Sequence, residues 1–282
     1  MTGSEPDYDK DRDSILIRGM RASDLPRGVE LSRTVGWNQQ DHDWQRFLAL
    51  GRQGCFVAEH EGRVVGTVTT INYQNRFGWV GMVIVDPAMR RRGIGTRLLM
   101  YGIEYLEGIG VETVKLDATP QGKLVYDQIG FEDEYGAARW ECVVPPLTPS
   151  TRAERLETRD IQEINDLDSP IFGADRKQVI ALYMEHYPER CFVLHSEGEV
   201  LGYLCGRPGY DAEHIGPWVA RNREVAETLF LTRLEQCSGQ RVFVDTVDPC
   251  PESQEILKKV GFNVQRPFIR MYRGPNNHPG KP

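Results

Sequence analysis

The sequence repeats a short pattern of strand, turn and helix-end residues, and this repeat limits the folds open to the chain. Three features of the first half recur in the second half at one constant spacing: Cys55-Phe56-Val57 as Cys191-Phe192-Val193, Glu61-Gly62 as Glu197-Gly198, and Gly66 as Gly202. Ile129-Gly130-Phe131 recurs as Val260-Gly261-Phe262 at a slightly shorter spacing. Since 282 residues suffice for two domains of ordinary size, we predict two copies of one α/β fold in tandem.

The segment from Val83 to Met100 contains the most distinctive loop of the first half. It reads as a buried strand, a turn at Asp86-Pro87, a loop rich in arginine and glycine, and then a helix. Glycines let successive backbone N–H groups converge at the start of the helix, where the helix dipole also favours an anion. The pattern predicts a pyrophosphate site formed by Arg90, Arg91, Arg92, Gly93, Ile94, Gly95 and Thr96.

Other phosphate-binding motifs fit this loop less well. Leu98 stands where a dinucleotide fingerprint has its third glycine, and no Gly-Lys-Ser or Gly-Lys-Thr tripeptide is present. The remaining pattern, Arg-x-x-Gly-x-Gly after a Val-x-Pro strand end, resembles the acetyl-CoA-binding motif of the GCN5-related N-acetyltransferases, the GNAT superfamily. The alternative is an ordinary tight turn between a strand and a helix, with a basic surface.

The expected order of elements is similar to that of the same family. We expect strands at 15–18, 55–59, 64–73, 77–85 and 114–118, helices from 23, 41–50, 96–106 and 123–129, and two final strands within 131–144. The resemblance implies an α/β fold with a mixed sheet in each copy. We predict a disordered acidic segment at 1–14 that is not a signal peptide, a first domain at 15–146, a proline-rich linker at 147–154, a second domain at 155–273 and a tail at 274–282.

The resemblance also implies roles for residues of the first domain. The strand end Val83, Ile84, Val85 would hold the pantetheine arm of acetyl-CoA as an added strand, which requires a splay from the strand at 114–118. Tyr126 matches the family tyrosine that gives a proton to the departing thiolate, and a phenol with a pKa of about 10 is protonated at neutral pH. The alternative for Tyr126 is packing on the sheet.

Other candidate positions rest on weaker patterns. Thr119 and Gly122 stand where the family often has asparagine and alanine, and Thr119 could still bond the pantetheine arm. Asp117 alternates away from Leu116 and Ala118 and is a candidate base, or a strand-end carboxylate that caps a turn. The predicted walls of the acceptor groove, with burial in the core as the alternative, are Trp37, Asn38, Tyr73 and Trp79.

The second half lacks the features that carry this chemistry. Where the first half has its loop, the second reads from His214 to Asn222 without Gly-x-Gly, and Pro217 removes a donor N–H. Leu257 takes the place of Tyr126. We therefore predict an active first domain, a degenerate second domain and one acetyl-CoA site per chain.

The charge and the cysteine content exclude some classes of function. The chain has 34 Lys and Arg residues and 41 Asp and Glu residues, and the net charge of −7 argues against nucleic-acid binding and favours amines as substrates. No apolar run is long enough to span a membrane. Six cysteines without a Cys-x-x-Cys pair, and six histidines with no ligand spacing, predict no metal site and a reducing cytoplasm.

We expect a cytoplasmic N-acetyltransferase that moves an acetyl group from acetyl-CoA to a primary amine of a small molecule, by direct attack in a ternary complex. The tandem copies predict a monomer with pseudo-dimeric domains, without nucleic-acid or membrane partners. One alternative is a sensor or scaffold that binds acyl-CoA without turnover. Another is an acetyltransferase that acts on a protein or peptide amine.

Overall fold

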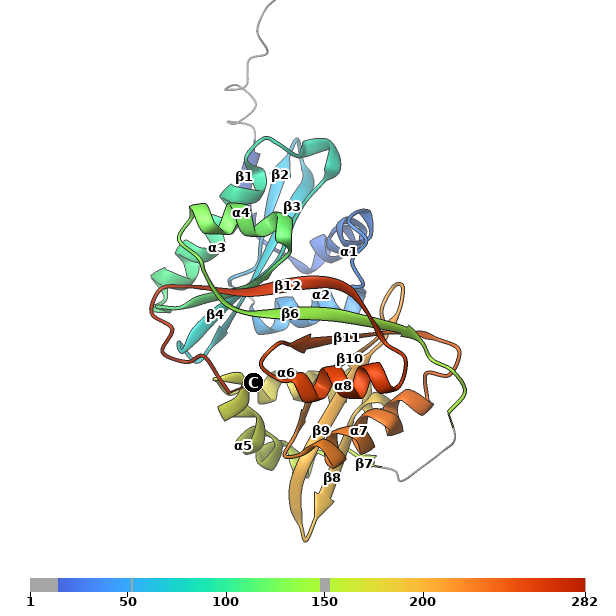
Figure 1. The fold of residues 1–282 in the computed structure, drawn as a ribbon. Coiled ribbons are helices and arrows are strands. Elements are labelled where there is room, and N and C mark those ends of the chain that lie inside the picture. Colours follow the sequence, from blue (N-terminus) through green and yellow to red (C-terminus); the bar gives the residue numbers. More distant parts are fainter. Residues whose placement is uncertain (1–14, 52, 148–152, 282) are drawn as a thin grey trace, which may run out of the picture. The chain divides into compact units, whose positions relative to one another are not determined.

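The computed structural model describes residues 15–51, 53–147 and 153–281, which form two compact units (Figure 1). Unit 1 contains the chain up to Asn72 and Gly78–Val111, and unit 2 contains Tyr73–Phe77 and the chain from Glu112 onward. The units do not coincide with the two repeats, because the last elements of the first repeat belong to unit 2. The acidic segment at 1–14 and most of the linker lie outside the described residues. The domain boundaries read from the repeat stay a prediction.

Unit 1 contains a sheet in the order β1-β2-β3-β4, with α1 and α2 on one face and α3 on the other (Figure 1). Its elements agree with the predicted ones to within a few residues. Their bounds are β1 (Ile15–Gly19), α1 (Leu25–Thr34), α2 (Asp41–Leu50), β2 (Phe56–His60), β3 (Arg63–Tyr73), β4 (Phe77–Val85) and α3 (Ile94–Gly108).

The two faces of this sheet are packed by different means. On the α1–α2 face, the fully buried ring of Trp44 lies over Gly28, and its indole N–H donates to Ser32 Oγ at 3.2 Å. Trp44 is therefore a core residue. On the other face, α3 buries apolar side chains at near-helical spacing, namely Leu98, Leu99, Ile103 and Leu106.

Unit 2 contains a sheet in the order β5-β12-β6-β11-β10-β9-β8-β7 (Figure 1). It combines elements of both repeats. Their bounds are β5 (Val114–Ala118), α4 (Pro120–Gln128), β6 (Glu132–Val143), β7 (Glu154–Arg155), α5 (Ile161–Phe172), α6 (Lys177–His186), β8 (Phe192–Ser196), β9 (Glu199–Arg207), β10 (Glu213–Ala220), α7 (Arg223–Glu235), β11 (Arg241–Val247), α8 (Pro251–Lys259) and β12 (Asn263–Arg273).

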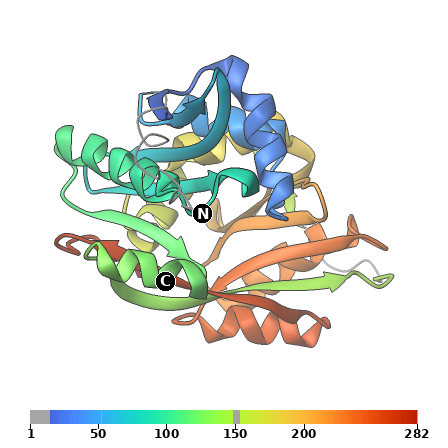
Figure 2. The same cartoon turned by 90° about the horizontal axis from the view of Figure 1, so that it is seen from above.

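The two repeats exchange their last strands within unit 2. β12, from the second repeat, pairs antiparallel with β5 and with β6, while β6, from the first repeat, pairs antiparallel with β11. Figure 2 shows β12 (dark red) and β6 (green) running side by side. The prediction of two final strands within 131–144 is wrong, because this segment forms β6 alone and the neighbour of β5 comes from the end of the chain.

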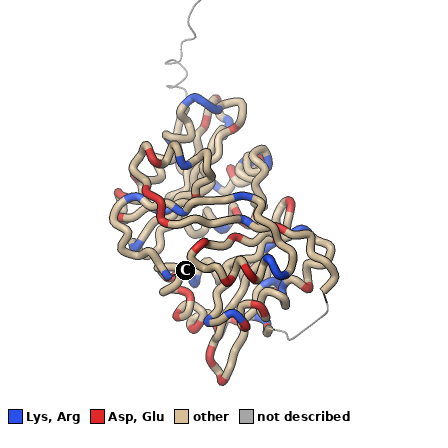
Figure 3. Tube along the Cα trace, viewed as in Figure 1, with Lys and Arg blue, Asp and Glu red and all other residues tan. Residues whose placement is uncertain are grey.

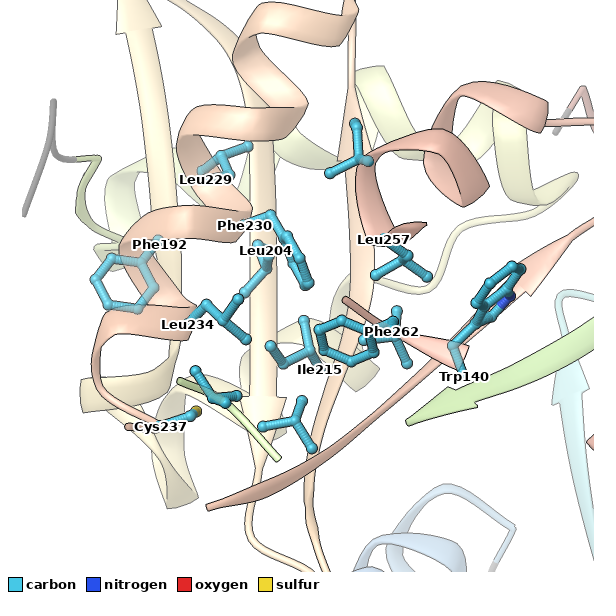
Figure 4. Packing of buried hydrophobic residues seen from close by; sticks show 14 of the residues in the cluster. Trp140, Phe192, Leu204, Ile215, Leu229, Phe230, Leu234, Cys237, Leu257 and Phe262 are labelled. Atoms are coloured by element: carbon cyan, nitrogen blue, oxygen red, sulfur yellow. The ribbon is translucent and has the colours of Figure 1, made fainter. Parts of the chain in front are cut away.

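The second repeat has its own hydrophobic core, between the sheet and the helices α7 and α8. Figure 4 shows Leu257 of α8 in this core with Phe230 of α7, Ile215 of β10 and Phe262, and all four side chains are at most 3% exposed. The residue that replaces Tyr126 in the second repeat is thus a packing residue.

Charged residues of both signs are distributed along the described chain (Figure 3), and a run of basic residues occupies the loop between β4 and α3. The six cysteines are free, and Cys55, Cys191 and Cys205 are buried. No helix in the described part of the chain has the length and apolar character to cross a membrane.

Candidate functional site

A cavity of about 360 Å³ in unit 1 lies where β4 ends and α3 begins. Its walls come from the strand end, the loop and the connection between α1 and α2. They consist of Val35, Trp37, Val83, Ile84, Val85, Met89, Arg90, Arg91, Gly93, Ile94, Gly95 and Thr96. The structure thus gathers the predicted strand end, every predicted loop residue except Arg92, and the predicted Trp37 around one cavity.

The residues at the start of α3 line this cavity. Gly93 has a φ of 74° and Arg91 a φ of 63°, so the backbone turns twice through the left-handed region just before the helix. The first intrahelical bond runs from Arg97 N to Gly93 O at 3.0 Å, and no side chain in the described chain caps the first turn. Uncapped N–H groups at a helix start, with the dipole behind them, are suited to hold an anion.

Ion pairs and hydrogen bonds fix the chain at the start of the loop. Asp86 Oδ1 accepts from Ala88 N at 3.0 Å, and its other carboxylate oxygen pairs with Arg27 of α1. Arg90 Nε donates to Val85 O at 3.3 Å, and Arg97 donates to Ile15 O at 3.2 Å. Arg90 and Arg97 therefore help to hold the backbone in place, while Arg91 is an exposed cation at the cavity.

Strand β4 carries a distortion that sequence reasoning missed. Met82 has a φ of 50°, a conformation that costs a methionine of order 1–3 kcal/mol. Its carbonyl accepts from the buried hydroxyl of Thr67 on β3 at 2.8 Å. This irregularity lies directly before Val83, where the strand begins to line the cavity. Nothing in the sequence of a methionine predicts a positive φ.

In unit 2, α4 carries Tyr126, and no residue of the described chain accepts a hydrogen bond from its hydroxyl. Thr119 caps the helix by accepting from Gly122 N at 3.2 Å, and the Tyr126 ring packs against Phe131 at a centroid distance of 5.9 Å. A Cβ on residue 122 would lie 3.1 Å from the ring, so glycine leaves room for it. Burial raises the pKa of Tyr126. A phenol with a raised pKa remains a proton donor at neutral pH.

Asp117 on β5 is paired with a cation. Arg270 of β12 donates to its two carboxylate oxygens at 2.9 Å and 3.2 Å, and also to the Tyr135 hydroxyl at 2.7 Å. Leu116 and Ala118 are buried whereas Asp117 is exposed, as the alternation predicts. Arg270 and Tyr135 were missed by sequence reasoning, because β12 reaches β5 only through the strand exchange.

The predicted acceptor residues lie in different surroundings. Asn38 is buried and has a bonding partner, and Trp79 is half-buried on β4. Tyr73, in unit 2, packs between Phe77 and Phe172 at 5.3 Å and 4.9 Å, and burial raises its pKa to about 12. Their roles in acceptor binding stay predictions.

In the second repeat, the helix start that corresponds to the start of α3 is that of α7, and it is capped. Residues 214–220 of the predicted segment belong to strand β10, so the prediction is wrong for these residues, and only the last two, Arg221 and Asn222, stand in place of the loop. The actual connection to α7 is Arg221-Asn222, and Asn222 Oδ1 accepts from Val225 N at 3.0 Å. This bond occupies a first-turn amide that an anion would need. Over 15–51, 53–147 and 153–281, no group of His, Cys, Asp or Glu side chains could hold a metal ion.

Two family models match the chain, one in each repeat. The model described as acetyltransferase (GNAT) family matches residues 25–131, and the model described as acetyltransferase (GNAT) domain matches residues 164–281. The predicted tandem of two copies is therefore confirmed.

Named relatives and solved structures agree with this result. Holothin acyltransferase of Pseudoalteromonas sp. is 26% identical over 84% of this chain and 81% of its own length. The uncharacterized N-acetyltransferase YitH of Bacillus subtilis is 24% identical over 87% of both chains. A putative acetyltransferase from Pyrococcus horikoshii has the same fold over 95% of this chain and 92% of its own, with a TM-score of 0.81 and 24% identity. A tandem GNAT protein from the clavulanic acid biosynthesis pathway matches 92% of this chain and 98% of its own, with a TM-score of 0.65 and 15% identity.

Proposed function

The chain belongs to the GNAT superfamily of acetyltransferases as a tandem of two such domains, and we propose that its first domain transfers an acetyl group from acetyl-CoA to a primary amine. The single observation that carries the proposal is the uncapped start of α3 at a cavity lined by Arg91 and the strand end of β4. The corresponding helix of the second repeat, α7, is capped by Asn222 and serves as the internal comparison for the start of α3.

The loop would hold the donor through its diphosphate. Backbone N–H groups between Arg91 and Thr96 face the phosphates, and the guanidinium of Arg91 adds a full charge. The half-exposed ends Val83 and Val85 of β4 offer peptide groups to the pantetheine arm, which carries amides and can bond to them as a strand does. Thr119 caps α4 through its oxygen, and its hydroxyl proton is left to donate to the same arm.

Tyr126 would supply the proton that the reaction needs. As the amine nitrogen forms its bond to the acetyl carbon, the carbon–sulfur bond breaks and the sulfur takes the phenol proton. Burial, which raises the pKa of Tyr126, keeps the phenol protonated until that moment. Direct attack needs no covalent acetyl-enzyme, and no cysteine is among the residues that line the donor cavity.

Asp117 remains the proposed base, with one condition that the structure adds. The amine must lose a proton, and Asp117 can accept it only when the pair with Arg270 opens or through a bridging water. The acidic net charge and the half-buried Trp37 at the cavity favour a small amine as acceptor.

The names of relatives bear on the acceptor in two ways. The relative that matches most of this chain is named for holothin, and another that matches about a third of it is named for mycothiol. Both names favour a small molecule as the acceptor. A match named N-alpha-acetyltransferase covers only 31% of this chain, so a protein or peptide amine is the second candidate.

An acceptor screen tests the proposal. Free thiol released from acetyl-CoA is followed with the full chain and a panel of amines, amino acids, polyamines, aminoglycosides and short basic peptides. Release that depends on one class of amine supports the transferase and identifies its acceptor. Binding of acetyl-CoA without release across the whole panel supports the sensor or scaffold instead.

A further inference from the structure

A second cavity, of about 370 Å³, lies within unit 2, and none of the residues proposed to hold acetyl-CoA lines it. The parallel pairing of β10 with β11 ends at Ile215 opposite Val244. From that point on, residues of both strands line the cavity, namely Gly216–Ala220 of β10 and Val244–Val247 of β11. The second repeat has therefore kept an open space between its strands although it has lost the features of a diphosphate site.

Arg176 lines this cavity in a fixed orientation. Its Nε and Nη2 donate to the fully buried carboxylate of Asp168 at 2.7 Å and 2.6 Å, and Asp168 also accepts from the Tyr203 hydroxyl at 2.6 Å. The guanidinium lies over the ring of Phe172 at 4.2 Å. No residue of the described chain accepts from Nη1 of Arg176. Such an arrangement holds one edge of the guanidinium ready for a ligand oxygen at little entropic cost.

Two further donors line the same cavity. The Tyr135 oxygen accepts from Arg270 Nη1 at 2.7 Å, so the Tyr135 hydroxyl proton is left to donate, and no described residue accepts it. Lys281 also lines the cavity, and within the described chain its ammonium has no ion-pair partner. The lining of the cavity thus includes an ammonium, a guanidinium edge and a phenol, all of which prefer an oxygen acceptor.

The charges around the cavity favour a single negative charge. Arg176 is balanced by Asp168, Arg270 by Asp117, and the lining carboxylate of Asp245 by Arg139. Lys281 is then the one cation in excess among these described residues. The remaining walls are apolar and include Ile171, Phe172, Pro217 and Val219.

From this arrangement we propose that the cavity of the second repeat binds a small organic carboxylate with an apolar body. The carboxylate lies among Lys281, Arg176 and Tyr135, and the apolar body extends between β10 and β11. Arg270 belongs both to this cavity and to the pair with Asp117 on β5. The ligand is accordingly either the acid end of the acceptor or a separate effector.

Isothermal titration of the full chain without acetyl-CoA tests the site. The probes are N-acetyl-leucine, N-acetyl-methionine and N-acetyl-phenylalanine, each compared with its own amide. We expect at least one acid to bind at one site per chain about tenfold more tightly than its amide, since a hydrogen bond to a charged group is lost in the amide. Equal binding of each acid and its amide, or no binding of any acid, overturns the proposal.

Variants assign the binding to this cavity. Lys281→Gln, at an exposed position, and Tyr135→Phe should each weaken the acid about tenfold and leave the amide unchanged. Arg159→Gln, an exposed arginine outside the cavity, is the matched control. Acid affinity that is the same in Lys281→Gln, Tyr135→Phe and the wild type overturns the assignment even if an acid binds.

Measurement of thiol release from acetyl-CoA distinguishes whether the bound carboxylate belongs to the acceptor or to a separate effector. If the free amino acid is acetylated and Lys281→Gln raises its KM without changing kcat, the ligand is the acceptor. If the N-acetylated acid changes the rate with another amine and is not consumed, the ligand is an effector. Because the titration needs no acetyl-CoA, a failure of the proposed transferase leaves the binding result intact, and the two failures are distinguishable.

Discussion

Arg270 of β12 donates two hydrogen bonds to Asp117 of β5, at 2.9 Å and 3.2 Å, although 153 residues separate them in the chain. The same arrangement occurs a second time, because Arg139 of β6 donates to both oxygens of Asp245 on β11 at 2.7 Å. Each pair joins one residue of the first repeat to one residue of the second. The strand exchange is therefore accompanied by two equivalent ion pairs.

Asp117→Asn should lower both stability and kcat. The amide offers Arg270 a single acceptor, and we expect the free energy of unfolding to fall by about 1–2 kcal/mol because Asp117 is partly exposed. Because Asp117 is the proposed base, kcat should also fall by about 10²-fold or more. Urea unfolding and initial rates measure the two effects. A fall in kcat of less than about tenfold would mean that Asp117 pairs with Arg270 and is not the base.

Tyr126→Phe should lower kcat by about 10²–10⁴-fold and leave the affinity for acetyl-CoA unchanged, because the variant removes a proton donor and keeps the ring. Tyr101→Phe on α3 is the matched control, since this tyrosine is 42% exposed and packs on Phe56. Rates and calorimetric titration are compared for both variants. Equal kcat in Tyr126→Phe and the control would leave Tyr126 a packing residue.

The raised pKa of Tyr126 also predicts the alkaline side of the pH profile. Burial disfavours the phenolate, so the acid form persists above the ordinary phenol pKa of about 10. Deprotonation of Tyr126 should therefore not lower kcat below pH 10, and any decline of kcat in that range should occur equally in the wild type and in Tyr126→Phe. A decline centred near pH 8 that disappears in this variant would contradict the assignment.

Asp245 should make the protein sensitive to acid. Burial alone would raise the pKa of Asp245. The hydrogen bonds and the charge of Arg139, and to a smaller extent those of His214, lower this pKa well below its usual range. A carboxylate whose pKa is lower in the folded state stabilises the fold at neutral pH, and this contribution is lost as pH falls below about 4. Urea midpoints between pH 7 and pH 2 should fall in the wild type and change less in Asp245→Asn, which starts from a lower value at pH 7. Parallel curves for the two proteins would show that Asp245 does not contribute.

Gly28→Ala should destabilise unit 1 through its contact with Trp44. The added Cβ would lie 2.9 Å from the fully buried indole, and overpacking of this kind costs about 1–3 kcal/mol. Gly108→Ala, also at a helical position, meets nothing within 4 Å and should gain up to about 1 kcal/mol from helix propensity. The midpoints of thermal unfolding of the two variants compare an added methyl group that clashes with one that contacts nothing. A midpoint for Gly28→Ala at or above that of the wild type would mean that the ring moves freely.

Much of the fold follows from local pattern. Strand β4 and helix α2 have the predicted bounds because alternating burial and clear start and stop residues mark them. The loop from Arg90 to Thr96 could be predicted as an anion site because glycine and arginine together at a helix start are typical of phosphate binding. The position of β12 between β5 and β6 could not be predicted, since a strand pattern shows which residues form a strand and not which strand pairs with it.

The parts of the site that sequence reasoning missed depend on tertiary contacts. The positive φ of Met82 arises from the way β4 meets its neighbours and leaves no mark in the residue type. Arg270 reaches Asp117 only through the exchanged strand. The one available signal was the repeat itself, because Val114-Lys115-Leu116-Asp117 and Val242-Phe243-Val244-Asp245 carry matching aspartates.

Calorimetric titration of the full chain with acetyl-CoA tests the central claim most directly. Gly93, before α3, and Gly239, in a turn of the second repeat, both have a φ of 74° and open space where a methyl group would lie, so alanine imposes the same backbone strain at each. We predict one site per chain in the wild type, about tenfold weaker binding in Gly93→Ala, and unchanged binding in Gly239→Ala. Two equivalent sites, no binding, or equal weakening in both variants would contradict the account.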